Sequence, residues 1–112
     1  MSVEALWTVE YEDGRSWRNG GVVVRQAGRA FGGDGQYYYV GKYTSEGVKF
    51  DAKVLATHYA GASNSAFGVP TKTMIIQIAA AKRANLIEGY MSSSVAPGRQ
   101  VPVRMTKRAD LP

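Results

Sequence analysis

The chain alternates apolar and polar residues in short runs that are separated by turn residues, a pattern typical of antiparallel β structure. The clearest run is 48–59, in which Phe50, Ala52 and Val54 share one face and mostly polar residues share the other. Three consecutive tyrosines favour a strand just before it, because aromatic side chains fit a pleated surface. The pattern predicts eight strands, at 5–12, 21–26, 29–31, 37–44, 48–59, 71–80, 86–92 and 100–107.

One segment, 75–88, is compatible with two structures. Its alanines, lysine and leucine are good helix formers, so local propensity alone accepts a helix of about three turns. The β-branched residues of 71–78 and the β pattern of the remaining chain favour two strands instead, joined near 82–85. We prefer the two strands, with the partly helical alternative left open.

The number and length of the predicted strands indicate an all-β fold. A chain of 112 residues without a break in composition fits a single domain, residues 1–112, with one core. Eight short antiparallel strands suit a small barrel, whose closure removes exposed edges, or a sandwich. An eight-stranded barrel is wide enough to be filled by its own side chains or to hold one small ligand.

The densest group of glycines lies in 28–44, around the sequence Gly32-Gly33-Asp34-Gly35. This sequence is superficially similar to a phosphate-binding loop, but no Gly-Lys-Ser/Thr follows it and no helix is predicted there. We interpret Gly32, Gly33 and Asp34 as a structural turn. One or more of the glycines would have a positive φ, and aspartate tolerates the same backbone region.

Charge is distributed unevenly along the chain, whose formal net charge is +5. Residues 4–13 include four carboxylates and no base, whereas 82–112 include six bases and two acids. This asymmetry bears on partners rather than on fold. Nucleic-acid binding is not favoured, because in the predicted fourth strand Tyr37, Tyr39 and Tyr43 face away from Lys42, so rings and bases diverge.

Residues for catalysis or metal binding are few. The chain has no cysteine, and His58 is its only histidine. Metal sites need three or four convergent ligands, and the spacing of Asp51 and Tyr59 from His58 provides none. We therefore expect a non-enzymatic protein without metal or cofactor. No basic segment followed by an apolar run begins the sequence, and no apolar run approaches the roughly 18 residues of a membrane span, so a cytoplasmic location is expected.

The order of the sequence motifs resembles that of a known family. The motifs are V-V-V-x-x-x-G-R, G-G-D, Y-Y-Y-V-G-K-Y, a long strand ending in T-H-Y, an F-G loop, and a closing V-x-V-R-M-T-K-R. This order is similar to that of the GrlR family, small bacterial regulatory proteins named for a negative regulator of type III secretion genes. The similarity covers most of the chain and is strongest in 21–59. It implies an eight-stranded, lipocalin-like antiparallel β-barrel with a tendency to homodimerise.

The resemblance also implies a function. In the namesake regulator, acidic residues in the loop after the G-G-D strand contribute to binding and inhibiting a transcription activator. The matching positions here are Ser45, Glu46 and Gly47, and only Glu46 is acidic. The resemblance thus implies a non-enzymatic regulator that acts by protein–protein contact, with a transcription activator as the partner that it would inhibit.

A second group of contact candidates comes from the chain itself. The segment 60–70 is rich in Gly, Ser, Asn and Pro, which predicts an exposed loop. Within it, Asn64, Ser65 and Phe67 are candidates for contact with a protein partner.

The alternative function is a barrel that binds a small apolar ligand in its interior. The predicted lining, taken from the inward faces of the strands, is Trp7, Val9, Tyr39, Tyr43, Phe50, Val54, Ile76 and Val103. Ligand pockets are mostly apolar with a few placed polar groups, and tyrosines supply both. The same residues equally predict an interior that is simply filled by its own side chains, and only an open cavity would favour the ligand.

Overall fold

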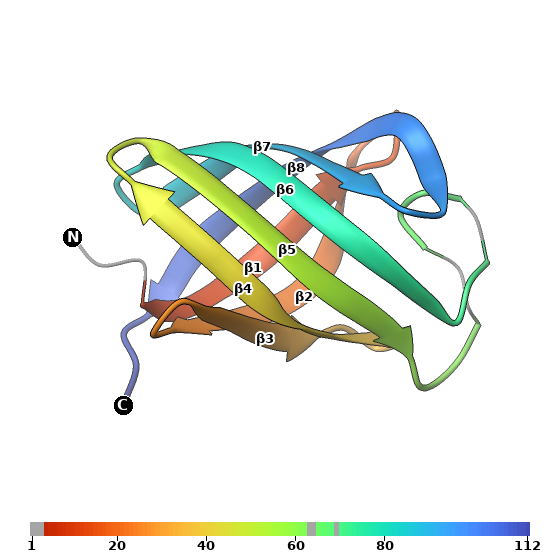
Figure 1. Ribbon diagram of the computed structural model, residues 1–112, viewed down its shortest axis with the longest axis horizontal. Helices are drawn as coiled ribbons and strands as arrows, with labels where there is room; N and C mark the ends of the chain where they lie inside the picture. Colours follow the sequence, from red (N-terminus) through yellow and green to blue (C-terminus); the bar gives the residue numbers. More distant parts are fainter. Residues whose placement is uncertain (1–3, 63–64, 69) are drawn as a thin grey trace.

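The chain forms a closed, eight-stranded antiparallel β-barrel in the computed structural model, which describes residues 4–62, 65–68 and 70–112 (Figure 1). The strands are β1 (Ala5–Glu12), β2 (Trp17–Gln26), β3 (Arg29–Gly33), β4 (Tyr37–Glu46), β5 (Lys49–His58), β6 (Thr73–Arg83), β7 (Leu86–Ser93) and β8 (Ala96–Ala109). Each strand pairs with the next one in the sequence, and β8 pairs with β1. Closure therefore leaves none of these strands at a sheet edge.

The predicted fold class, all-β with an eight-stranded barrel, is confirmed, and so is the choice of two strands for 75–88. β6 and β7 are joined by a tight turn in which Ala84 has a φ of 52°. The alanines of this segment pair with β5, so that Ala80 lies opposite Phe50 in the ladder. Pairing with a neighbouring strand overrides helix propensity here.

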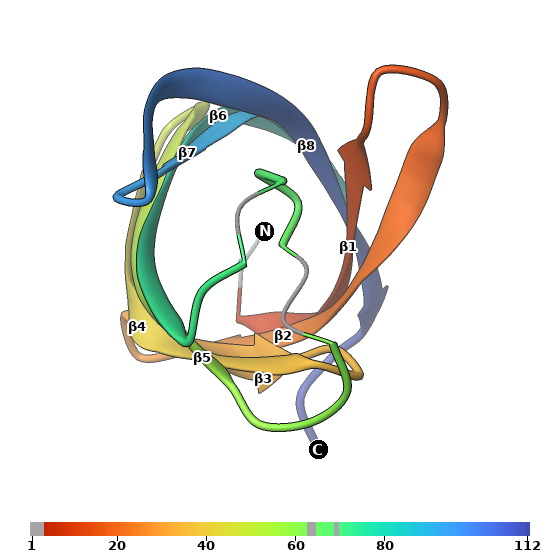
Figure 2. The same cartoon turned by 90° about the vertical axis from the view of Figure 1, so that its right-hand side faces the viewer.

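The predicted start of the second strand, at residue 21, is wrong, because β2 already begins at Trp17 and the stretch 17–20 is not a loop. The Asp13 carboxylate accepts hydrogen bonds from the backbone N–H groups of Arg15 and Ser16, which makes a short turn. β2 then continues the ladder with Trp17 opposite Glu12. Figure 2 shows this hairpin extending beyond the rim of the barrel. After Trp17 the segment continues with Arg18, Asn19 and Gly20, so alternation alone does not reveal it as a strand.

Gly32 and Gly33 lie in β3 rather than in the predicted turn, and neither has a positive φ. A Cβ atom on Gly32 would lie 2.0 Å from the carbonyl oxygen of Val22, and one on Gly33 would lie 2.7 Å from that of Tyr37. These glycines therefore serve the close approach of neighbouring strands in a sharply bent sheet.

Asp34 does make the following turn, without a positive φ. Its Oδ1 accepts hydrogen bonds from the backbone N–H groups of Gln36 and Tyr37, both at 2.8 Å. The prediction of a structural turn is thus correct for Asp34 and wrong for the two glycines.

One end of the barrel, where β1 begins and β8 ends, is called here the terminal end, and the opposite end, where residues 59–62 and 65–68 lie, the loop end (Figure 1). The terminal end is filled by large side chains that are completely or almost completely buried, namely Trp7, Arg25, Phe50, Ile87 and Met105. The arginine is an unusual member of such a core, because charged side chains are rarely fully buried without a partner.

The Arg25 side chain is held between two aromatic rings. Its guanidinium carbon lies 4.5 Å from the ring centre of Phe50 and 5.1 Å from that of Trp7. Its Nη2 donates to the sulfur of Met105, and neither Nε nor Nη1 has a hydrogen-bond partner among the described residues. Burial lowers the pKa of Arg25 to about 10, so the group is still protonated at neutral pH. Cation–π attraction takes the place that a carboxylate usually fills.

Gly32 and Gly35, both in the sequence Gly32-Gly33-Asp34-Gly35, provide a matched test of the close approach between β2 and β3. We expect Gly32→Ala to lower the free energy of unfolding by about 1–3 kcal/mol, because the new methyl group forces the β2 backbone away. Gly35 has open space where a Cβ would lie and no positive φ, so Gly35→Ala should change stability by less than about 0.5 kcal/mol. Urea unfolding measures both. Equal stabilities of the two variants would show that the close approach at Gly32 is unimportant.

Candidate binding surfaces

The two predicted groups of partner-binding residues lie at opposite ends of the barrel. Ser45 and Glu46 end β4, and Gly47, with a φ of 59°, makes the turn into β5 at the terminal end. Ser65 and Phe67 belong to the segment at the loop end (Figures 1 and 2). Asn64 lies outside the described residues. The two groups therefore do not form one contact surface.

Phe67 is completely buried, which contradicts its prediction as an exposed contact. It belongs to the core cluster, and its carbonyl oxygen accepts a hydrogen bond of 2.8 Å from Nη1 of Arg99 in β8. Ser65, half-buried, accepts the Phe67 backbone N–H with its hydroxyl oxygen at 3.2 Å. Figure 2 shows this segment lying across the opening of the barrel. In the sequence 60–70, Phe67 is a single large aromatic residue among small ones, and this feature could have predicted that the loop is anchored inward.

Beneath Phe67 lies a cavity of about 280 Å³ at the loop end of the barrel. Three of the eight predicted ligand-lining residues line it, namely Val9, Tyr39 and Ile76. Trp7, Phe50 and Val103 are almost completely buried in the packed core, and Val54 and Tyr43 are half-buried against that core. The interior therefore divides into a filled terminal end and a small cavity at the loop end.

Tyr37 and Tyr39, which line this cavity, both use their hydroxyls in hydrogen bonds within the protein. Tyr39 donates to Oδ2 of Asp34 at 2.5 Å, and Tyr37 donates to the carbonyl oxygen of Thr71 at 2.7 Å. Burial, reinforced by the hydrogen bond to Asp34, raises the pKa of Tyr39 far above its ordinary value. Tyr39 is thus a neutral donor already committed to Asp34, and its role is to fix the turn after β3.

The outer surface of the barrel carries an apolar face that the sequence analysis did not identify. Val24, Phe31, Val40, Leu55 and Ile75 are consecutive partners in the ladders from β2 to β6, and all point outward. Val22 and Tyr38, in the neighbouring row, extend this surface. These seven residues are called here the apolar face. Val40 is 58% exposed and Leu55 48% exposed, although both lie within strands.

Beside the apolar face runs a row of three cations. Arg29 is the ladder partner of Lys42, and Lys42 is the ladder partner of Lys53. None of the three takes part in an ion pair within the described part of the chain. Like charges directly opposite one another in a sheet are destabilising, so this arrangement is unfavourable for folding alone.

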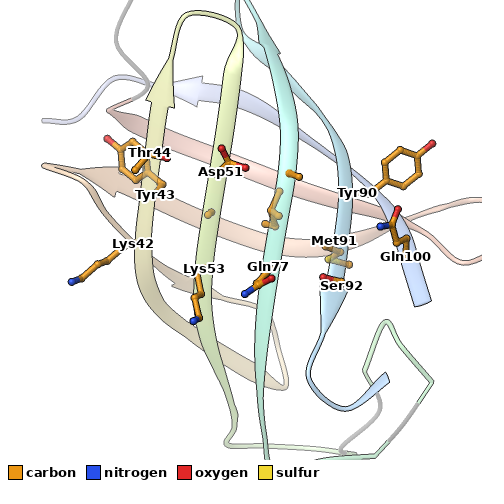
Figure 3. Close-up of a pocket in the computed structure, with 13 residues that line it drawn as sticks. Lys42, Tyr43, Thr44, Asp51, Lys53, Gln77, Tyr90, Met91, Ser92 and Gln100 are labelled. Carbon is orange, nitrogen blue, oxygen red and sulfur yellow. The ribbon is translucent and has the colours of Figure 1, made fainter. Parts of the chain in front are cut away.

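A groove of about 480 Å³ follows the other side of this basic row (Figure 3). Its walls are two rows of outward side chains, Lys42, Lys53, Gln77 and Ser92 on one side, and Thr44, Asp51, Ala79 and Tyr90 on the other. Gln100 of β8 also lines it. Tyr43, which was predicted to line the interior, contributes to the floor of this groove. Its ring stacks on that of Phe50, with 5.8 Å between the ring centres.

His58, the single histidine of the chain, is held by contacts with Gly61 and Tyr37. Its Nε2 lies 2.9 Å from the carbonyl oxygen of Gly61, and its ring packs edge-on against Tyr37 with 5.5 Å between ring centres. In the described ranges, no three His, Asp or Glu side chains gather in a way that could hold a metal ion. No helix long and apolar enough to cross a membrane occurs in those ranges either.

Comparison with known proteins gives no match to a protein family and no match to a curated protein. The resemblance to the GrlR family therefore remains a prediction from the sequence motifs. The function has to be argued from the surfaces of the barrel.

The role of Phe67 as an inward anchor can be tested by Phe67→Ala. Removing a buried phenyl ring commonly costs about 3–5 kcal/mol, but a loop can open locally and so limit the loss. We expect a moderate drop in the urea midpoint together with increased fluorescence of 1-anilinonaphthalene-8-sulfonate as the cavity opens. Val48→Ala is the control, since Val48 is 69% exposed in the turn after β4. Unchanged stability and fluorescence in Phe67→Ala would contradict the anchoring role.

Proposed function

We propose that the protein is a non-enzymatic regulatory barrel that acts by protein–protein contact, and that its apolar face joins two copies into a dimer. The exposed apolar face across β2–β6 is the observation that supports this proposal. Large apolar side chains on adjacent strands, all directed to solvent, are a common mark of an interaction site.

A second copy is the occupant that fits this face best. None of the seven residues of the apolar face is charged, so the face suits another uncharged surface. The same face on a second copy is such a surface. The closed barrel offers no strand edge for a partner to extend, so contact has to be made face to face. A two-fold axis brings the same patch of both copies together.

The size of the face indicates how strong such a dimer is. Five strands about 4.8 Å apart and two rows of residues give a patch of roughly 300 Å² per copy. Standard interfaces bury about 800 Å² per partner. We therefore expect a weak dimer whose formation depends on protein concentration.

The regulatory role rests on the family resemblance. The one acidic residue at the matching positions, Glu46, is exposed at the end of β4, and no other carboxylate accompanies it at Ser45 or Gly47. We propose that a partner protein, such as a transcription activator, is bound by the outer surface of the sheet rather than by this turn.

A small apolar ligand is the second candidate, and the loop-end cavity supports it. Its volume of about 280 Å³ is close to the lower end of the range of roughly 300–1,000 Å³ found for ligand sites. The buried Phe67 and its neighbour Ser65 are among the residues that line it. A ligand in this cavity would have to be small and would require the loop to open.

The dimer can be tested with Leu55→Lys, which places a charge in the centre of the apolar face. We expect wild-type protein to show a rising average mass between low and high micromolar concentration in sedimentation equilibrium, and Leu55→Lys to remain monomeric. Val48→Lys, a matched change at an exposed valine outside the face, should behave like the wild type. A wild-type mass that stays monomeric throughout, or a dimer unaffected by Leu55→Lys, would refute this role of the face.

A further inference from the structure

We propose that the groove beside the basic row binds an acidic segment of another protein, at a site separate from the apolar face. The groove is formed by the outward side chains of β4–β7 and by Gln100 of β8. Figure 3 shows Lys42, Lys53 and Gln77 side by side on neighbouring strands along one wall. Their common orientation follows from the ladder, in which Lys42 pairs with Lys53, and Lys53 with Gln77.

The basic row is the first argument for an anionic occupant. Arg29, Lys42 and Lys53 occupy three consecutive strands, so neighbouring cations are separated by about one strand spacing, close to 4.8 Å. No carboxylate forms an ion pair with any of them in the described ranges. An arriving chain of carboxylates removes the repulsion among the three cations and adds charge-assisted hydrogen bonds.

The one carboxylate that lines the groove, Asp51, does not neutralise this row. Its Oδ2 lies 3.8 Å from Nζ of Lys49, and it belongs to the opposite wall with Thr44 and Ala79. One wall of the groove is therefore cationic and the other is nearly neutral. An occupant has to present its negative charge to the Lys42 side.

The neutral wall indicates that the occupant also needs an apolar side chain. Tyr90 is 55% exposed there, and Ala79, its ladder partner on β6, is too small to fill the space beside the ring. An apolar side chain can pack against this ring. Gln77 and Gln100 offer amide groups that can hydrogen-bond to a peptide backbone. The groove thus suits a segment that carries acidic residues along one side and an apolar residue on the other.

A protein segment fits these features better than a nucleic acid does. The basic row is about two strand spacings long, roughly 10 Å. Nucleic-acid sites usually neutralise many more phosphates and provide several stacking rings, whereas Tyr90 is the single ring of this groove's neutral wall.

The test uses the full-length protein and a fluorescein-labelled peptide in which glutamates alternate with leucines. Fluorescence anisotropy at low salt should show saturable binding that weakens as salt is raised. Lys53→Glu, which reverses one charge of the row where it lines the groove, should weaken binding about tenfold or more. Lys72→Glu is the matched control, because Lys72 is exposed at the loop end, before β6 begins, and should bind like the wild type.

Two further measurements separate the alternatives. Leu55→Lys should still bind the peptide, so loss of the dimer and loss of the groove site are distinguishable. A peptide with glutamine in place of every glutamate should bind at least about tenfold more weakly. Equal binding by Lys53→Glu and the wild type, equal binding of the glutamine peptide, or tighter binding of an oligothymidylate of the same charge would each overturn the proposal.

Discussion

The pairing of β8 with β1 is the constraint on which the whole structure depends. It closes the sheet and gives the backbone groups of both terminal strands their partners, so that every strand has one face toward the interior and one toward solvent. Because side chains alternate with a period of two, a slip of one residue in any ladder exchanges the two faces of that strand. The register of the ladders therefore decides three features together: the packed interior, the apolar face and the basic row.

The interior is a poor candidate for a general ligand site because a charge is buried within it. Arg25 occupies the terminal end between Trp7 and Phe50, without a carboxylate partner among the described residues. Removing a guanidinium from water is unfavourable by several kcal/mol unless other contacts compensate. The two rings, the Met105 sulfur and close packing provide that compensation only while the space stays filled. Within the described part of the chain, the interior space that could take a ligand lies beside Phe67, at the other end.

Alternation along the chain predicted the eight strands and their inward faces, because a strand's burial pattern is local information. The same reasoning could have predicted that Arg25 is buried, since it shares the inward face of β2 with Val23. The remainder depends on contacts between distant residues. Gly32 is required where β2 approaches closely, and Phe67 is buried at a site where its carbonyl oxygen meets the distant Arg99. The apolar face and the basic row appear only when the ladders align residues from separate strands, and a single sequence does not reveal that register.

The central claim is that the protein acts through its outer sheet surface and not through its interior. The most direct measurement is a dilution series of uniformly ¹⁵N-labelled protein, in which backbone amide shifts are followed by NMR at each concentration. The account predicts concentration-dependent shifts centred on Val40 and Leu55 and their neighbours in β4 and β5. Shifts that are absent from these strands, or that gather around Val9, Tyr39 and Phe67 at the loop-end cavity, would contradict it.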